Sequence, residues 1–402
     1  MSRLLILSNG HGEDLSGAML GRSLLQFGHR VDALPLVGQG CPYTDLGIPL
    51  LLNGTRVFST GGLGYTSWRG RLTEILQGQA LYLLRNLVYL LSYASYYDLV
   101  VVVGDVVPVT AAWLCRRPTA VYLVAYSSYY EGRLRLPWPC RNCLTTRHVL
   151  AVFSRDALTA EDLSGQLSCP VTFLGNPFMD PVWQSQPPLP QQWRLGLLPG
   201  SRQPELKNNL ELLMRVVEHL PESLLASGKL AVDIALVASL TDKDLSQLGA
   251  ARGWRLEDCF YTGEAIHKLC WGRHRVNVRR GQFAALLQGS DLLLSMAGTA
   301  TEQAVGLGRP VLQLPGLGPQ FTSKFAEAQR RLLGPGVFCA VGDAGSPKLL
   351  AATARLALDL LERSVFDVQF QQSCRKEAVQ RLGPPGGSSR IARAINQLLR
   401  TN

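Results

Sequence analysis

Long apolar runs are missing from this 402-residue sequence. The longest candidate, residues 86–97 (NLVYLLSYASYY), is bounded by Arg85 and Asp98 and is much shorter than the roughly 20 residues that a membrane-spanning helix requires. The opening residues, MSRLLILSNGHGED, lack the pattern of a secretory signal and predict a first strand instead. We therefore expect a cytoplasmic protein without membrane-spanning helices.

Short motifs that would identify several other protein classes are also missing. The nine cysteines form no evident disulfide framework, and the pair Cys140 and Cys143 has no second pair with which to build a zinc site. Neither a GxGxxG fingerprint nor a Walker loop occurs after the predicted strands. Helix-turn-helix, zinc-finger and RNA-recognition signatures are absent as well, so we expect no nucleic-acid partner.

Acidic residues are fewer than basic ones, and the imbalance is uneven along the chain. The net charge is +10; residues 1–180 carry 14 basic and 12 acidic side chains, whereas residues 181–402 carry 26 and 18. A basic second half suits a small polyanionic ligand or an anionic membrane surface.

The sequence does contain alternating apolar runs and helical stretches, which are typical of an α/β protein. Continuous runs such as Leu99–Val103 predict parallel strands that are buried on both faces. A chain of this length is expected to form two domains, and the Pro- and Gln-rich residues 184–192 predict a linker. We expect domains at 1–183 and 193–375, followed by a helical tail at 376–402.

The most informative stretch is residues 295–316, SMAGTATEQAVGLGRPVLQLPG. A preceding apolar strand, a small-residue turn, a helix starting at Thr299 and a second strand predict one βαβ unit. The N–H groups of Gly298, Thr299, Ala300 and Thr301 would lie at the positive end of the helix, where a diphosphate binds well. Glu302, one step into the helix, could accept hydrogen bonds from a sugar diol.

The same residues also fit a structural motif, the capping box, in which Glu302 bonds back to the backbone N–H of Thr299. A second loop favours ligand binding. Pro199-Gly200-Ser201-Arg202 follows a predicted strand, its glycine lets the backbone approach a ligand, and Ser201 and Arg202 offer a hydroxyl and a charge. The alternative for Arg202 is a solvated surface charge.

Polar residues follow two predicted strands of the first domain, at the edge where open α/β sheets bind ligands. Asn9, Gly10, His11, Gly12 and Glu13 form the first loop, and Asp105 follows the strand at 99–103. Because Pro108 separates Asp105 from the predicted helix at 109–114, we expect Asp105 to face the crevice rather than to cap that helix.

Three stretches resemble lipid-A-disaccharide synthase, a GT-B glycosyltransferase related to the MurG-type transferases and to UDP-N-acetylglucosamine 2-epimerases. They are LLPGSRQPEL at 197–206, MAGTATEQAVGLGRPVLQLP at 296–315 and LGNPFMD at 174–180, where Asn176 replaces the histidine of the family. In the first domain Gly12-Glu13 match the GExSGD loop of the family, but Gly17 falls where the family has Asp. Asp105 sits where the family has an acid, and Tyr126–Tyr130 replaces its acceptor segment.

The resemblance implies a GT-B fold with two Rossmann-like, doubly wound domains facing a cleft and a C-terminal helix returning to the first domain. It implies a UDP-sugar-dependent, inverting glycosyltransferase with a lipid-linked acceptor, which needs no metal or cofactor. The donor set would be Gly200, Ser201, Arg202, Gly298, Thr299, Ala300, Thr301, Glu302 and Gln320. Asn9, Gly10, His11 and Gly12 would lie on the acceptor side. Asp105, or else Glu13, would be the general base.

Two other functions stay open: a UDP-sugar 2-epimerase and a UDP-sugar-binding protein without turnover. A lipid acceptor would bring the protein to the inner face of the cytoplasmic membrane. Two features favour such contact, namely an aromatic stretch around Trp68 and residues 86–97, and the basic cluster Lys268, Arg273, Arg275, Arg279 and Arg280. A solvated basic hairpin and a buried helix are the alternatives.

Overall fold

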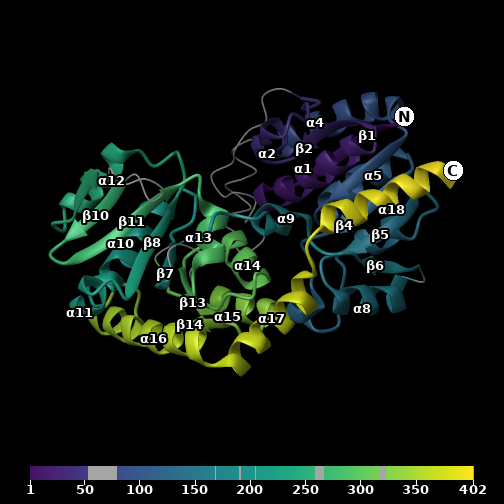
Figure 1. The fold of residues 1–402 in the computed structure, drawn as a ribbon. Helices are drawn as coiled ribbons and strands as arrows, with labels where there is room; N and C mark the ends of the chain where they lie inside the picture. Colours follow the sequence, from purple (N-terminus) through teal and green to yellow (C-terminus); the bar gives the residue numbers. More distant parts are fainter. Residues whose placement is uncertain are drawn as a thin grey trace. The chain divides into compact units, whose positions relative to one another are not determined.

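The computed structural model describes residues 1–52, 79–167, 169–189, 192–203, 205–258, 267–316 and 323–401. The chain divides into two compact units (Figure 1). Unit 1 contains Met1–Asp180 and Leu382–Asn402, and unit 2 contains Pro181–Arg381. The sequence-based boundaries at 183 and 376 lie near these divisions.

Unit 1 contains a six-stranded parallel sheet with the order β2-β1-β3-β4-β5-β6. Its strands are β1 (Arg3–Ser8), β2 (Arg30–Pro35), β3 (Leu99–Val103), β4 (Thr119–Leu123), β5 (Val149–Ser154) and β6 (Val171–Phe173). All five residues of β3 are buried, as expected of a parallel strand that is covered on both faces. The strand order reverses between β1 and β3, so the carboxyl ends of these two strands form the topological switch point.

Helices cover both faces of this sheet. They are α1 (His11–Gln26), α2 (Cys41–Asp45), α4 (Gln79–Tyr93), α5 (Val106–Cys115), α6 (Ser128–Glu131), α7 (Cys140–Leu144), α8 (Ala157–Leu167), α9 (Asp180–Trp183, which crosses the division between the units) and α18 (Gly387–Thr401), with 3-10 turns η2 (Ala94–Tyr96) and η3 (Pro177–Met179). In the described part of the chain, no helix has the length and apolar character needed to cross a membrane.

The last helix returns to unit 1, as expected from the resemblance. Figure 1 shows α18, in yellow, beside α1, against which it packs. Its apolar residues Ile391 and Ile395 are fully buried, while the backbone N–H groups of Gly386 and Ser388 donate to the Asp180 carboxylate over 2.8 and 2.9 Å. Asp180 therefore satisfies the otherwise unpaired N–H groups at the start of α18.

Unit 2 contains an eight-stranded sheet with the order β14-β13-β12-β7-β8-β11-β10-β9. Its strands are β7 (Trp193–Leu198), β8 (Leu230–Leu236), β9 (Arg255–Asp258), β10 (His267–Trp271), β11 (His274–Arg280), β12 (Leu292–Ser295), β13 (Val311–Gln313) and β14 (Val337–Cys339). Pairing is parallel from β14 to β11, and β10 and β9 extend the sheet with antiparallel pairs.

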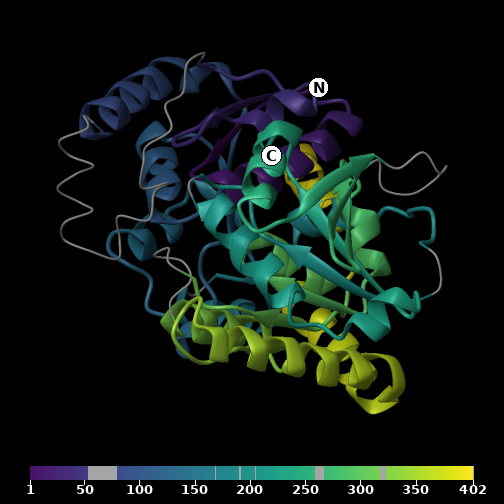
Figure 2. The same cartoon turned by 90° about the vertical axis from the view of Figure 1, so that its left-hand side faces the viewer.

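The helices of unit 2 are α10 (Glu205–Val217), α11 (Glu222–Ala226), α12 (Asp242–Ala250), α13 (Phe283–Gly289), α14 (Thr299–Gly306), α15 (Ser323–Leu333), α16 (Pro347–Phe366) and α17 (Val368–Leu382). Helix α16 packs against α10 and against β7 and β12, and Figure 2 shows it running beneath the sheet. Buried leucines at 206, 210 and 213 form the apolar stripe with which α10 faces this core. The predicted strand at 259–261 lies outside the described residues.

Candidate functional site

Two loops of unit 2 leave neighbouring strands at the same edge of the sheet. Leu198, the last residue of β7, pairs with Ser295, the last residue of β12, and the N–H of Met296 donates to the Leu198 carbonyl over 2.8 Å. Gly200 has a φ of +92°, and a Cβ there would lie 3.2 Å from the Met296 oxygen. A glycine at this position therefore lets the two loops approach each other closely.

The side chain of Asn209 joins these two loops, and sequence reasoning missed it. Asn209 lies on α10, is 2% exposed, and donates from its amide nitrogen to the carbonyl of Pro199 (2.9 Å) and to that of Met296 (3.3 Å). A buried amide that bonds both backbones makes the spacing of the loops depend on one side chain. An asparagine within an otherwise amphipathic helix was the available signal.

Helix α14 begins immediately after the second loop. Its N-cap is Gly298, no side chain caps it, and the capping box considered for Thr299 does not form. The N–H groups of Thr299 and Ala300 belong to the first helical turn, which has no intrahelical acceptors, and both residues are partly exposed. Glu302 is also half-buried. This end of α14 thus offers N–H groups to an anion.

Thr301 was expected to bind the donor, but its surroundings in the structure do not fit that role. It is fully buried, its hydroxyl donates to the Ala297 carbonyl over 2.7 Å and lies 2.7 Å from the Ser295 hydroxyl, and its N–H bonds the Gly298 carbonyl. All of its polar groups therefore support the turn, and none is available to a ligand.

The other predicted donor residues are placed differently. Ser201 and Arg202 are exposed on the loop after β7. Gln320 lies outside the described residues.

In unit 1, the loop after β1 meets the loop after β3 at the switch point. The backbone N–H of Asn9 donates to Glu13 Oε2 over 2.8 Å, and the Asn9 side-chain amide lies 3.3 and 3.4 Å from the two carboxylate oxygens of Asp105. Gly104 has a φ of +153°, and a Cβ there would lie 2.8 Å from Glu13 Oε2. Gly104 thus leaves the space that the Glu13 carboxylate occupies. Gly10 is the N-cap of α1, and Gly12 is partly buried in its first turn.

Asp105 does cap a helix, contrary to the expectation drawn from Pro108. Helix α5 begins at Val106, earlier than predicted, and the N–H of Val107 donates to Asp105 Oδ1 over 2.8 Å. Pro108 lies in the first turn, where a missing N–H costs nothing. Asp105 therefore combines a capping role with its place beside Asn9.

The carboxyl groups of this loop cluster are hard to ionise. Burial raises the pKa of Glu13 well above its usual value, and the negative charges of Asp105 and Asp14 raise it further, against the lowering effect of the Asn9 N–H. Burial also raises the pKa of Asp105, although its hydrogen bonds from Val107 and Asn9 oppose the shift. A carboxyl group with a raised pKa is a stronger base when it does ionise.

A buried hydrogen-bonded chain of two hydroxyls and one carboxylate, which was not predicted from the sequence, involves Asp14, the neighbour of Glu13. The Tyr43 hydroxyl donates to Ser8 Oγ over 2.8 Å, and Ser8 Oγ donates to Asp14 Oδ1 over 2.6 Å. All three residues are fully buried, and burial raises the pKa of Asp14 to about 7. Gly17 makes room for this chain, since a Cβ there would collide with the Tyr43 hydroxyl.

An apolar cavity of about 500 Å³ opens beside the helix that Asp105 caps. Its walls are apolar side chains of α4 (Leu84, Leu87) and α5 (Val107, Leu114) together with Trp138. The polar side chain in this lining, Thr110, donates its hydroxyl to the Val106 carbonyl over 2.7 Å. The volume falls within the range of about 300–1,000 Å³ that is typical of ligand pockets.

Several large apolar side chains on α4, on α5 and at Trp138 are exposed, and three of them (Leu84, Leu114 and Trp138) also line this cavity. We call them the α4–α5 surface: Leu84, Val88, Leu91, Trp113, Leu114 and Trp138, with exposed fractions from 41% for Leu114 to 85% for Trp138. Trp68, the other aromatic residue considered for membrane contact, lies outside the described residues. A group of exposed apolar residues of this size is typical of an interaction surface.

The predicted basic cluster is not one exposed patch. Arg279 is 2% exposed and its Nε lies 3.1 Å from Asp233 Oδ1, in a buried group with Arg194. Its inclusion among membrane-facing residues was therefore wrong. Arg273 and Arg275 are exposed at the turn between β10 and β11.

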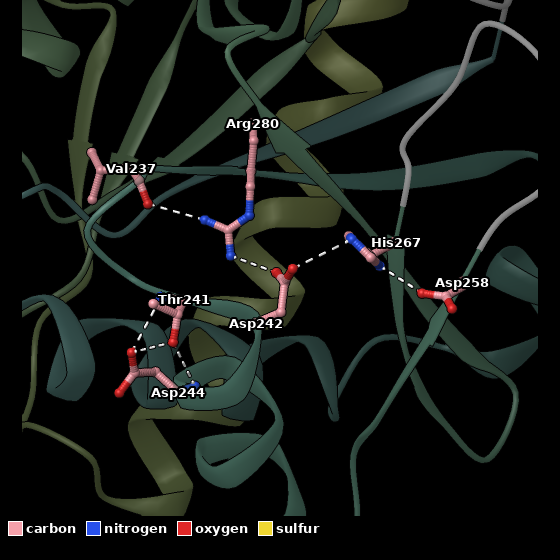
Figure 3. A network of polar contacts seen from close by, with 7 residues as sticks. All are labelled: Val237, Thr241, Asp242, Asp244, Asp258, His267 and Arg280. Carbon is pink, nitrogen blue, oxygen red and sulfur yellow. Dashed lines mark hydrogen bonds and ion pairs between the residues drawn. The ribbon is translucent and has the colours of Figure 1, made fainter.

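Arg280 has polar partners at the carboxyl ends of β8 and β11 (Figure 3). Its guanidinium donates to the Val237 carbonyl over 3.0 Å and to Asp242 over 2.8 Å. Figure 3 also shows His267 between Asp242 and Asp258, with nitrogen–oxygen distances of 3.5 and 2.9 Å. Two of the five residues of the predicted cluster, Arg279 and Arg280, thus have structural partners within unit 2.

Asn176, at the position where the resembling family has histidine, is a buried structural residue. Its side-chain nitrogen donates to the carbonyls of Arg155 (2.8 Å) and Leu382 (2.9 Å). Within the described ranges, no group of three or more His, Cys, Asp and Glu side chains is arranged to hold a metal ion.

Comparisons with known proteins identify the fold. Neither the models of protein families nor the curated proteins include a match to this chain. Among solved structures, the calicheamicin glycosyltransferase CalG4 matches with a TM-score of 0.60 at 19% identity, over 99% of this chain and 98% of that one. The glycotransferase of kitacinnamycin matches with 0.58 at 17% identity, over 99% of each chain.

A third match is the UDP-GlcNAc 2-epimerase from Neisseria meningitidis, solved with UDP-GlcNAc, with a TM-score of 0.51 at 16% identity over the whole of both chains. Likeness at these identities establishes the architecture. The chain has the two-domain α/β fold with parallel sheets that GT-B glycosyltransferases share.

Proposed function

We propose that the protein is a glycosyltransferase, similar to lipid-A-disaccharide synthase, that moves a glucosamine-type sugar from a UDP-sugar to a lipid-linked acceptor with inversion. Unit 2 binds the donor and unit 1 binds the acceptor. The apolar cavity beside α5, the helix that Asp105 caps, is the observation that carries this proposal, because it gives an apolar acceptor a place in the unit that contains Asp105 and Glu13.

In this proposal the donor diphosphate binds at the start of α14. The N–H groups around Gly298, Thr299 and Ala300 and the exposed Ser201 and Arg202 stabilise the negative charge that develops on UDP as the bond to the sugar breaks. Glu302 accepts hydrogen bonds from the ribose hydroxyls. The protein supplies this stabilisation itself, and the proposal requires no metal or cofactor.

The acceptor hydroxyl must lose a proton as it attacks the sugar carbon from the face opposite UDP. We assign this proton to Glu13 ahead of Asp105, because hydrogen bonds from Val107 and Asn9 reach both carboxylate oxygens of Asp105, whereas the Asn9 N–H reaches only Oε2 of Glu13. Asp105 acts on Glu13 through its charge, which raises the pKa of Glu13. Asn9, Gly10, His11 and Gly12 form the backbone around this base, on the acceptor side.

The α4–α5 surface supports the lipid part of the proposal. A lipid-linked acceptor stays in the bilayer, because each buried CH₂ group contributes about 0.8 kcal/mol. A protein that transfers sugar to it must therefore bind the membrane surface, and exposed leucine and tryptophan side chains, three of which line an apolar cavity, suit that contact. We place the protein at the inner face of the cytoplasmic membrane.

A UDP-sugar 2-epimerase is the competing function. Its only substrate is the nucleotide sugar, so it would leave the apolar cavity of unit 1 without a role. A binding protein without turnover would bind UDP-sugar and release neither UDP nor product.

The full chain incubated with radiolabelled UDP-sugars and membrane lipid, in excess chelator, distinguishes these functions. We expect lipid-dependent release of UDP together with a labelled glycolipid, and loss of both in Glu13→Gln. Conversion of the UDP-sugar without lipid would favour the epimerase. Binding without turnover would favour the third function. Activity that chelator abolishes and magnesium or manganese restores would contradict the charge-stabilising role of the α14 start.

A further inference from the structure

Unit 2 contains a second cavity at the opposite end of β12 from the donor loops. Asp291 immediately precedes β12 and Pro310 immediately precedes β13, so the cavity lies at the amino ends of these parallel strands. The end of α16 and the first turns of α17 complete its walls. Its volume is about 270 Å³, which is near the lower limit for ligand pockets and suits a small molecule.

The charged side chains that line this cavity are predominantly basic. Arg309 and Arg375 both face it, whereas Asp291 is the single acid in its described lining. Asp291 also accepts a hydrogen bond from the backbone N–H of Arg194 over 2.9 Å, which occupies one of its oxygens. Cys374 does not add negative charge, because burial raises its pKa to about 11 and keeps the thiol protonated.

The two guanidinium groups are close enough to affect each other. Burial lowers the pKa of Arg309, the charge of Asp291 opposes that shift, and the charge of Arg375 lowers the pKa further. Arg309 also donates a hydrogen bond to the Gln288 carbonyl. An arginine does not lose its proton in a protein, so two positive charges and one negative charge line the cavity.

The backbone is shaped to place Arg375 at the cavity. Gly308 has a φ of +73°, and a Cβ there would lie 2.9 Å from Arg375 Cγ. Glycine therefore allows the stem of Arg375 to lie directly on the loop that carries Arg309. Arg375 itself is exposed, and none of the ion pairs formed among the described residues includes it.

We propose that this cavity is a second anion site, which binds the phosphate group of a small molecule between Arg309 and Arg375. A phosphate offers several oxygens to two guanidinium groups and neutralises the excess positive charge. Phe370 provides an apolar wall beside it. The site is separate from the donor loops, because it lies at the amino ends of β12 and β13, whereas the donor loops follow the carboxyl ends of β7 and β12.

The test measures binding of inorganic phosphate to the full chain by calorimetry, at constant ionic strength with chloride as the reference. We expect saturable binding to the wild-type protein and about a tenfold or greater loss of affinity in Arg375→Gln, the range for hydrogen bonds to charged groups. Arg375→Lys keeps the charge and should keep most of the binding. Thermal unfolding checks that both variants fold.

Two further variants make the test specific. Arg355→Gln removes an exposed arginine of α16 outside the cavity and should bind phosphate like the wild type. Arg202→Ser alters only the donor loop and should leave the phosphate binding that depends on Arg375 intact. The proposal is overturned if the wild type shows no saturable binding, if Arg375→Gln binds phosphate unchanged, or if Arg202→Ser abolishes binding. Glucose 1-phosphate in a parallel titration separates a phosphorylated metabolite, which would bind more tightly, from free phosphate.

Discussion

The side-chain nitrogen of Asn9 lies 3.3 Å from one carboxylate oxygen of Asp105 and 3.4 Å from the other. This contact joins two loops that are almost a hundred residues apart in sequence, at the point where the strand order of unit 1 reverses. It also places Asp105 where its charge raises the pKa of Glu13. The ionisation of the proposed base therefore depends on a residue outside its own loop.

The first prediction concerns the pH dependence of activity. The base must be ionised, so kcat/KM should rise with pH through a pKa above the usual value for glutamate. Asp105→Asn removes a negative charge while keeping a residue that caps helices well, so the rising limb should shift to lower pH. An unshifted limb would mean that the charge of Asp105 does not raise the pKa of the base. A complete loss of activity in a folded Asp105→Asn would mean that Asp105 itself takes the proton.

The second prediction concerns Asn209. Asn209→Ala removes both hydrogen bonds between α10 and the donor loops, leaving two buried carbonyls unpaired, and should lower the free energy of unfolding by about 1–3 kcal/mol. It should also weaken UDP binding measured by calorimetry, because the loops lose their common support. Asn208→Ala changes an exposed neighbour and serves as the control. Unchanged UDP affinity in Asn209→Ala would limit its role to stability.

The third prediction concerns Glu302. Glu302→Ala should weaken UDP binding by about 1–3 kcal/mol, the cost of leaving polar groups of the ligand unpaired. Since no side chain caps α14 at its N-cap residue Gly298 and the capping box does not form, the variant loses no helix cap, and Tm should change little. A large drop in Tm with unchanged UDP affinity of the folded protein would contradict the ribose-binding role.

The fourth prediction concerns the buried Asp14. Its folded pKa of about 7 lies above the usual value of 3.8, so the folded state binds a proton that the unfolded state has already released. The free energy of unfolding should therefore fall as pH rises from about 4 to about 7, by about 2–4 kcal/mol from this group. Denaturant unfolding across this range should show a smaller slope for Asp14→Asn. Equal slopes would show that Asp14 titrates normally.

The fifth prediction concerns the membrane. Binding to anionic vesicles should weaken in Leu84→Gln and Val88→Gln, whose side chains are 56% and 58% exposed on α4. Arg273→Ser and Arg275→Ser should reduce only the salt-dependent part of the binding. Sedimentation with vesicles at low and high salt measures both effects.

Val341→Gln is the matched control for the vesicle experiment, because Val341 is 89% exposed and lies in unit 2, outside the α4–α5 surface. The lipid acceptor loses its physical support if wild-type protein ignores anionic vesicles at low salt.

Continuous apolar runs were sufficient to predict most parallel strands, because a strand buried on both faces contains few polar residues. Both donor loops were also proposed from the strand–loop–helix pattern, although the pairing of β7 with β12, which makes them neighbours, was not predicted. The short edge strand β14, by contrast, was not predicted, because a three-residue strand gives little periodicity.

The buried polar contacts were the part that sequence reasoning could not reach. The asparagine in α10 was a local signal, but a carbonyl that it bonds lies 87 residues away. The Tyr43–Ser8–Asp14 chain likewise joins separate elements, so the sequence does not show which groups make these contacts. The error on Arg279 has a different origin. Side chains alternate between the two faces of a strand, so Asn277 and Arg279 lie on the same face of β11, where both contact Asp233. The basic residues of this segment had instead been treated as one exposed face.

The return of α18 to unit 1 has a consequence for biosynthesis. The buried side chains Ile391 and Ile395 complete a core whose other members are encoded at the start of the chain. A ribosome therefore releases all of unit 2, which is continuous in sequence, before unit 1 has its final helix. Unit 1 therefore completes its core only after unit 2 has been synthesised, and the face of α1 that α18 covers stays uncovered until then.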